Sequence, residues 1–252
     1  MREDPHLSRR QLLGLLGAAG AWGLARNTGA EAGAPRPGRP VGMDGWATGL
    51  DCVVTPAQTE GPYFVDERLN RADIRRDPSD GTVSEGAPVK LAIKVSRVVA
   101  AACAPVVGAM VDLWQCDALG IYSDVLDPNG FFDTRGRKFL RGYQLTDRSG
   151  TAEFLTLYPG WYTGRTVHIH FKVRVFDGDL RAQEFTSQLY FDDALTDQVF
   201  ERPPYNTRGP RSTRNERDGI YRSRNSGDAL LLRLERDGAG YRGVTSVGLR
   251  MS

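Results

Sequence analysis

Two of the three histidines in this 252-residue chain lie one residue apart, at His168 and His170. The residues around them alternate between apolar and polar types, which is typical of a β-strand. Because side chains alternate between the two faces of a strand, both imidazoles point to one side and Ile169 points to the other. Two histidines on one face can bind one metal ion, although an isolated pair also occurs as surface or hydrogen-bonded histidines.

A metal ion at this pair needs further ligands, and the third histidine, His6, lies in a segment that resembles an export signal. The remaining donors are therefore carboxylate, thiolate, phenolate or water. Tyr162 lies six residues before His168, and Tyr122 follows another glycine-containing turn. A bound trivalent ion would lower a tyrosine pKa far below its usual value of about 10, and two phenolates favour iron(III) over iron(II) or zinc. The alternative for each tyrosine is a core aromatic with a hydrogen-bonded hydroxyl.

Four stretches of the chain resemble the intradiol ring-cleavage dioxygenases, the family of catechol, hydroxyquinol and protocatechuate dioxygenases. In chain order they are TPAQTEGPYF (55–64), VDLWQCDALGIYSD (111–124), YPGWYTGRTVHIHFKV (158–173) and FTSQLYF (185–191). Four motifs in the right order are a far more specific signal than the histidine pair alone.

The resemblance implies a non-haem iron(III) site, and it assigns four protein ligands: Tyr122, Tyr162, His168 and His170. It also implies that Tyr162 acts as a catalytic base and that Arg165 lies beside the bound substrate. Positions in or behind the substrate pocket are implied for Tyr63, Trp114, Gln188 and Tyr190.

The activity that the resemblance implies is cleavage of a catechol-type aromatic diol by O2, between the two hydroxylated carbons, to a cis,cis-muconate-type diacid. Two competing interpretations remain open. One is a non-catalytic β-sandwich binding module, and the other is a zinc or iron(II) enzyme that uses the histidine pair with a carboxylate such as Asp117 or Asp124.

The chain departs from the family pattern at two points near the histidines. Gly164 stands where some relatives carry a second aromatic, so a wider pocket is expected. Thr166-Val167 replaces the common Pro-Ala, so a less rigid loop is expected. No long helical N-terminal dimerisation region, as in the catechol branch, is visible, so the resemblance points toward the protocatechuate-like or an exported branch. The diol that serves as substrate and the state of a homo-oligomer stay open.

The elements that must position these residues are predicted to be mostly strands. Hydrophobic patterning indicates strands over or within 89–98, 106–116, 139–146, 152–157, 167–175, 183–191, 229–235 and 241–248. The DRSG turn at 147–150 predicts that the strands on either side form a hairpin, and 193–200 is the best helix candidate. The pattern favours an all-β fold, a β-sandwich with little helix and with long functional loops over 117–138 and 192–227.

The first 32 residues resemble a twin-arginine-type signal peptide. Ser8-Arg9-Arg10 precedes a weakly apolar run over 12–25 that is too short to span a bilayer comfortably, and Ala30-Glu31-Ala32 fits a cleavage site. We therefore expect a periplasmic or secreted protein without a membrane span in its mature form. A Gly/Pro-rich linker is expected over 33–50, and a single catalytic domain over 51–252.

The composition argues against nucleic acid as the main partner, because the net charge is only +2. The small aromatic diol and O2 are the partners that the resemblance implies. Arginines do gather late in the chain, either as a solvated loop or as a field that attracts anionic substrates. Three cysteines, Cys52, Cys103 and Cys116, allow one disulfide, but their spacing does not decide which two would pair.

Overall fold

A computed structural model describes residues 53–99, 102–223 and 226–251. The expected signal peptide (1–32), the expected linker (33–50) and Cys52 lie outside the described residues. Cys103 is disulfide-bonded, whereas Cys116 is free and buried. No helix within the described ranges is long and apolar enough to cross a membrane.

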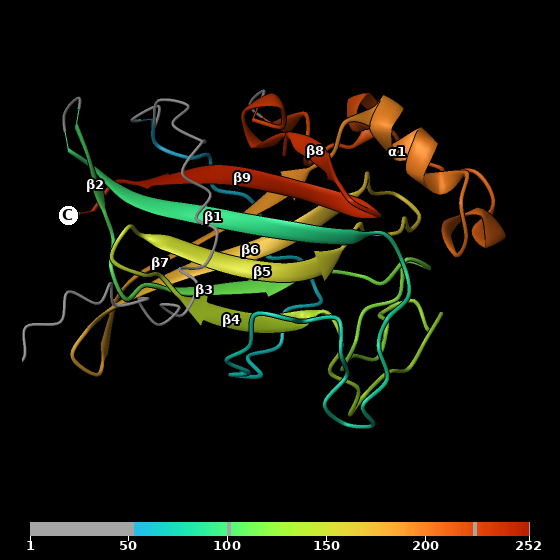
Figure 1. Cartoon of the computed structure of the whole chain (residues 1–252), viewed down its shortest axis with the longest axis horizontal. Helices are drawn as coiled ribbons and strands as arrows, with labels where there is room; N and C mark the ends of the chain where they lie inside the picture. Colours follow the sequence, from blue (N-terminus) through green and yellow to red (C-terminus); the bar gives the residue numbers. More distant parts are fainter. Residues whose placement is uncertain (1–52, 100–101, 224–225, 252) are drawn as a thin grey trace, which may run out of the picture. The chain divides into compact units, whose positions relative to one another are not determined.

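Two β-sheets form the protein's framework (Figure 1). The first sheet has the order β2 (Ala102–Pro105), β1 (Pro88–Val99), β9 (Gly240–Leu249) and β8 (Leu234–Asp237), with β5 (Thr151–Leu157) also paired to β1. The second sheet has the order β4 (Arg141–Leu145), β3 (Met110–Trp114), β6 (His168–Asp177) and β7 (Leu180–Tyr190). Neighbouring strands are antiparallel, except that β1 runs parallel to β9. The predicted all-β sandwich is confirmed.

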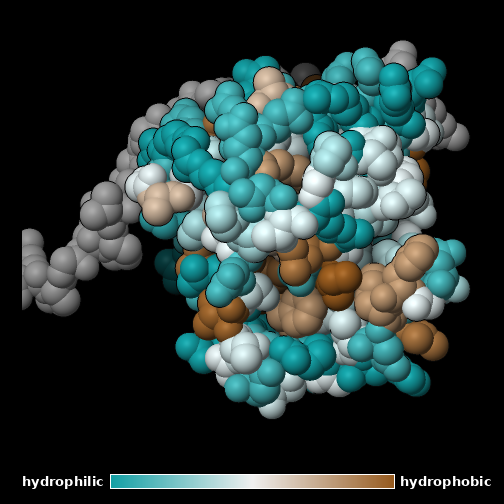
Figure 2. All heavy atoms as spheres, turned by 90° about the vertical axis from the view of Figure 1, so that its right-hand side faces the viewer, coloured by the Kyte–Doolittle hydropathy of each residue, from teal (hydrophilic) through white to brown (hydrophobic). Residues whose placement is uncertain are grey.

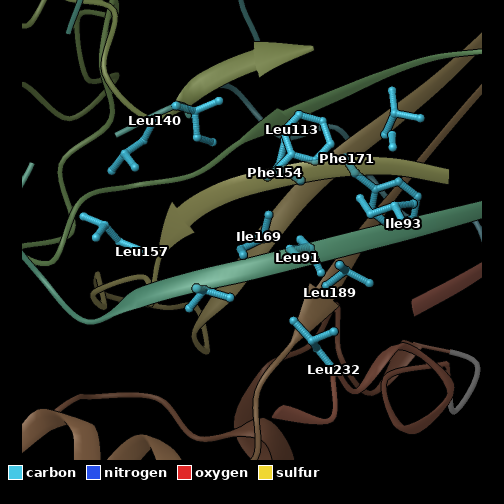
Figure 3. Packing of buried hydrophobic residues seen from close by; sticks show 14 of the residues in the cluster. Leu91, Ile93, Leu113, Leu140, Phe154, Leu157, Ile169, Phe171, Leu189 and Leu232 are labelled. Atoms are coloured by element: carbon cyan, nitrogen blue, oxygen red, sulfur yellow. The ribbon is translucent and has the colours of Figure 1, made fainter. Parts of the chain in front are cut away.

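The hydrophobic core lies between the two sheets (Figure 3). Leu91 and Ile93 of β1 face the second sheet, where Ile169 and Phe171 of β6 are fully buried. The period of two along β6 therefore turns Ile169 into the core and leaves its two flanking histidines on the opposite face of the sheet.

Helix is scarce among the described residues. The α-helix α1 (Asp193–Phe200) has the predicted bounds, and the side chain of Asp192 caps its first turn by accepting from the Leu195 amide at 2.8 Å. Short 3-10 helices follow it among the described residues: η1 (Tyr205–Arg208), η2 (Asn215–Arg217) and η4 (Asp228–Leu230).

The predicted hairpin over 139–157 is wrong. The strands β4 and β5 that flank the DRSG turn belong to different sheets, because β4 pairs with β3 and β5 pairs with β1. The turn itself is present, since Asp147 accepts hydrogen bonds from the amides of Ser149 and Thr151. A turn fixes the local reversal of the chain, whereas the choice of partner strand depends on which faces are buried together. The strand predicted over 229–235 begins only at Leu234, because 228–230 form a 3-10 helix.

Candidate metal centre

The histidine pair lies at the start of β6, on the face of the second sheet that points away from the core. Trp114 of β3 is the register partner of His170, and the two rings stack at a centroid distance of 4.9 Å with an angle of 8°. His168 and His170 are both buried. The tryptophan therefore forms a rigid backing for one imidazole of the pair.

Tyr122 reaches the same place from the turn that follows β3. The Asp117 carboxylate accepts the amides of Leu119 and Ile121, each at 2.9 Å, and Gly120 adopts a φ of +79° to complete the turn. Tyr122 then points inward and is 1% exposed. An aspartate and a glycine at these positions are typical of tight turns, so the turn that carries Tyr122 forms without help from a metal ion.

The structure brings together the four residues that the resemblance assigned as ligands. The Nε2 atom of His168 lies 3.0 Å from Nε2 of His170 and 3.1 Å from Oη of Tyr162. The Tyr122 ring centroid lies 5.8 Å from that of Tyr162 and 6.3 Å from that of His170.

Both histidines are held neutral. Burial lowers the pKa of His168 well below its usual value, with a further contribution from Arg165. Burial and the neighbouring His168 lower the pKa of His170 in the same way. His168 Nδ1 lies 2.6 Å from the Thr166 carbonyl oxygen, which can only accept, so this nitrogen carries the proton. Nε2 of His168 consequently presents a lone pair to the other donors.

The four donors fit a metal ion. Oη of Tyr122 is buried and has no hydrogen-bond partner among the described residues, a state that requires an explanation in a native site. The two imidazole nitrogens lie 3.0 Å apart, close enough for both to bind one ion. Burial raises the pKa of Tyr162 to about 12, an effect that Arg165 partly offsets. A multiply charged ion would supply the remaining stabilisation of a phenolate.

Among the described residues, the alternative site of two histidines and a carboxylate has no third ligand. No group of three or more His, Cys, Asp and Glu side chains within the described ranges could hold a metal ion. Asp117 is engaged by the turn amides, and the Asp124 carboxylate accepts the Gly136 amide at 2.6 Å. Neither carboxylate is directed at the histidine pair.

Arg165 lies against the donor cluster and has three polar neighbours. Its Nη1 lies 3.4 Å from His168 Nε2, its Nη2 donates to Gln188 Oε1 at 2.6 Å, and its Nε donates to Asp218 Oδ2 at 2.9 Å. The Tyr190 hydroxyl also donates to Gln188 Oε1, at 3.1 Å. Gln188 and Tyr190 therefore support the arginine from the strand β7 beneath it.

A cavity of about 440 Å³ adjoins the donors. Tyr162 and Arg165 line it on the metal side, and its apolar lining includes Ile121, Phe132 and Ile220. Tyr63 also lines the cavity, stacks on Tyr122 at 4.4 Å, and donates its hydroxyl to Asp127 at 2.5 Å. Figure 2 views the end of the sandwich that carries many of the long loops, where apolar side chains gather in the lower half.

Of the four residues expected in or behind the pocket, Tyr63 lines the cavity and the other three lie behind its wall. Trp114 stacks behind His170, while Gln188 and Tyr190 lie behind Arg165, and all three are buried. These three residues project from the strands that carry the site, whereas loop residues form the walls of the cavity. An added Cβ at Gly164 would meet nothing within 4 Å, but Gly164 does not line the cavity.

Sequence reasoning missed the contributions of the second long loop. Asp218 is completely buried, yet it lies in an arginine-rich stretch that is typical of a solvated surface. Within that stretch, Arg211 and Arg214 pair with Asp197, while Arg208 lines the cavity and lies 4.8 Å from the centre of the Trp161 ring. The Asp218-Gly219 pair predicts a turn, and nothing in the local sequence marks the aspartate as buried.

Comparisons with known proteins agree with this arrangement. Residues 59–205 match a family model described as Dioxygenase. The protocatechuate 3,4-dioxygenase beta chain of Burkholderia cepacia is 32% identical over 162 residues, which are 57% of this chain and 63% of that relative, so the match spans less than two thirds of the relative's length.

Solved structures extend the similarity to most of the described chain. An intradiol ring-cleavage dioxygenase from Tetranychus urticae has a TM-score of 0.68 and 30% identity, and the alignment covers 79% of this chain and 95% of that one. The dioxygenase domain of a dioxygenase carbohydrate-binding protein fusion from Streptomyces sp. SirexAA-E has a TM-score of 0.54 and 26% identity, with 79% and 100% covered. The chain therefore belongs to the family of intradiol ring-cleavage dioxygenases.

Proposed function

We propose that this protein is an iron(III)-dependent enzyme that uses O2 to cleave a catechol-type aromatic diol between its two hydroxylated carbons, giving a cis,cis-muconate-type diacid. The observation that carries the proposal is the convergence of two phenols and two neutral imidazoles beside a cavity of about 440 Å³. When bound by Tyr122, Tyr162, His168 and His170, iron(III) would bind the diol oxygens and make the ring reactive toward O2.

Tyr162 is the proposed base for the substrate. It lines the cavity, whereas Tyr122 lies beneath the ring of Tyr63, so an entering diol meets the Tyr162 oxygen first. As a phenolate, Tyr162 Oη can accept a proton from a diol hydroxyl. Burial raises the pKa of the Tyr162 phenol to about 12, so its phenolate is a strong base.

Arg165 is proposed to stabilise negative charge on the substrate. Two anchors, Gln188 and Asp218, occupy its Nη2 and Nε atoms, and its remaining terminal nitrogen lies on the side of His168. A cation fixed in this way stabilises charge that develops on the ring without having to reorient during the reaction. The apolar walls at Ile121 and Phe132 reduce the water around the reacting groups and strengthen this interaction.

The proposal is tested by iron analysis, visible absorption, and O2 uptake with catechol, hydroxyquinol and protocatechuate, with products identified by mass spectrometry. We expect iron in equimolar amount to the chain, a burgundy colour from phenolate-to-iron(III) charge transfer, and a ring-opened diacid from at least one diol. Tyr162→Phe should shift the absorption and slow diol binding. Tyr143→Phe, which removes a hydroxyl outside the cavity and the donor cluster, should change neither.

A colourless iron-loaded protein would contradict the proposed ligands. A protein that binds no iron and turns over none of the diols would instead favour a non-catalytic binding module. Cleavage outside the two hydroxylated carbons would exclude the intradiol reaction.

We also propose that the catalytic domain is exported, through a twin-arginine-type signal in the first 32 residues. The disulfide at Cys103 supports this proposal, because structural disulfides are rare in reducing compartments. Cell fractionation of the full chain and of an Arg9→Lys, Arg10→Lys variant tests it. We expect the variant to remain inside the cell, and equal export of both chains would refute the signal.

A further inference from the structure

Asp218 is a fully buried carboxylate that accepts four hydrogen bonds. Its Oδ2 accepts from Arg165 Nε at 2.9 Å and from the Thr166 amide at 2.8 Å. Its Oδ1 accepts from the amides of Ile220 at 2.7 Å and Tyr221 at 3.0 Å. One side chain thus joins the turn before the histidine strand to the turn that begins at residue 218. Each oxygen accepts two hydrogen bonds, which is the full capacity of a carboxylate.

The geometry of Arg165 depends on this carboxylate. Gln188 holds one terminal nitrogen of the guanidinium, and a single hydrogen bond leaves rotation about that contact open. The second anchor, at Nε, fixes the plane of the group and thereby directs Nη1 to the side of His168. Planar guanidinium groups are positioned most sharply when two of their donors are engaged at once.

Charge provides a second reason for a carboxylate at this position. Arg165 is a largely buried cation next to two imidazoles that are proposed to hold a metal cation. Within the described residues, Asp218 is the carboxylate that pairs with it. Without that negative charge, the guanidinium would be repelled by the metal and would move toward solvent.

The same carboxylate shapes the cavity. Ile220, whose amide it holds, is part of the cavity wall, and the Ile220 carbonyl accepts from Gln58 Nε2 at 3.2 Å. The backbone of Ile220 is therefore held by hydrogen bonds at both its amide and its carbonyl oxygen.

We propose that Asp218 is a positioning residue of the active site, which holds the Arg165 guanidinium against the substrate. The inference rests on the proposed ring-cleavage function. It assigns to Asp218 a role that acts through Arg165 and does not require contact with the substrate or the iron.

The experiment compares Asp218→Asn with wild type and with a matched control, Asp197→Asn, in iron-loaded protein. Asp197 is also a carboxylate paired with arginines in the same long segment, through Arg211 and Arg214, but it does not line the cavity. We expect Asp218→Asn to lower kcat by about 10- to 100-fold, with a smaller rise in KM. Its iron content and visible absorption should remain those of wild type, and Asp197→Asn should leave all four quantities unchanged.

A double-mutant cycle separates positioning from a general structural effect. If Asp218 acts through Arg165, then adding Asp218→Asn to an Arg165→Gln variant should lower kcat less than about 2-fold further. Asp218→Glu, which retains the charge but displaces the anchor, replaces Asp218→Asn in both backgrounds if the latter does not fold, and the same non-additivity is expected.

Two results would overturn the inference: full activity of the Asp218 variants, or an equal loss in the wild-type and Arg165→Gln backgrounds. Both results count only if the wild-type protein cleaves a diol in the same assay. A wild type that cleaves none would refute the proposed function itself, so the two failures are distinguishable.

Discussion

Gly120 lies where an alanine cannot fit, and the substitution Gly120→Ala should disturb both stability and the metal site. Its φ is +79°, and an added Cβ would lie 2.1 Å from the Trp161 carbonyl oxygen and 2.2 Å from Arg208 Nη1. The left-handed conformation costs an L-residue about 1–2 kcal/mol. The arginine can swing away, but the carbonyl belongs to the backbone next to Tyr162, and overpacking of this kind costs about 1–3 kcal/mol. The expected loss in unfolding free energy is therefore about 2–5 kcal/mol.

The same loop offers a matched control in Gly130→Ala. Gly130 has a φ of +75°, but an added Cβ there would meet nothing within 4 Å. This variant should lose only the conformational part, about 1–2 kcal/mol. With an m value of about 2 kcal/mol/M, urea unfolding should show midpoint shifts of about 1–2.5 M for Gly120→Ala and about 0.5–1 M for Gly130→Ala.

A second readout links this strain to the site. Because the crowded carbonyl belongs to the residue before Tyr162, Gly120→Ala should also change the visible absorption of the iron-loaded protein, whereas Gly130→Ala should not. Equal midpoint shifts with unchanged absorption in both variants would show that the backbone at Trp161 moves away from the added Cβ at little cost in free energy. That result would refute the predicted effect of crowding at Gly120.

Three further outcomes are expected. Tyr122→Phe should weaken iron binding, yet it should stabilise the metal-free protein by about 1–3 kcal/mol, because it removes a buried hydroxyl without a hydrogen-bond partner. A loss of stability in calorimetry of the metal-free protein would contradict this. Ile169→Val should lower the unfolding free energy by about 0.5–1.5 kcal/mol in urea titrations, since Ile169 is 0% exposed, and an unchanged midpoint would argue against its place in the core. Burial alone would raise the pKa of Asp77, but hydrogen bonds from Arg137 and Ser79 lower it from 3.8 to about 2. Its stabilising effect should be complete above pH 4 and disappear as the pH falls toward 2, and Asp77→Asn should flatten this part of the curve of unfolding free energy against pH; parallel curves would count against the pairing.

The parts of the protein that follow from local periodicity could be predicted from the sequence. The period of two along β6 separates the faces of His168 and Ile169, and the helix at 193–200 starts at an aspartate cap. Motif resemblance then supplied the tyrosines, which no spacing rule would have joined to the histidines.

Pairings between distant segments could not be predicted in this way. The DRSG turn gives no information on whether its two flanking strands pair with each other, and in the structure they join different sheets. In the same way, Trp114 as a backing for His170 depends on the register of β3 against β6, which is set by burial of their opposite faces in the core.

The sequence by itself determined the strand-rich class, the face on which the two imidazoles lie, and the family to which the motifs belong. The tertiary structure alone decided that Asp218, 53 residues after Arg165, is buried against it, and that loop residues rather than Gln188 and Tyr190 line the cavity. The physical reason is that hydrogen bonds within a turn or strand depend on neighbours in the chain, whereas burial of a charge depends on which loops cover it after folding.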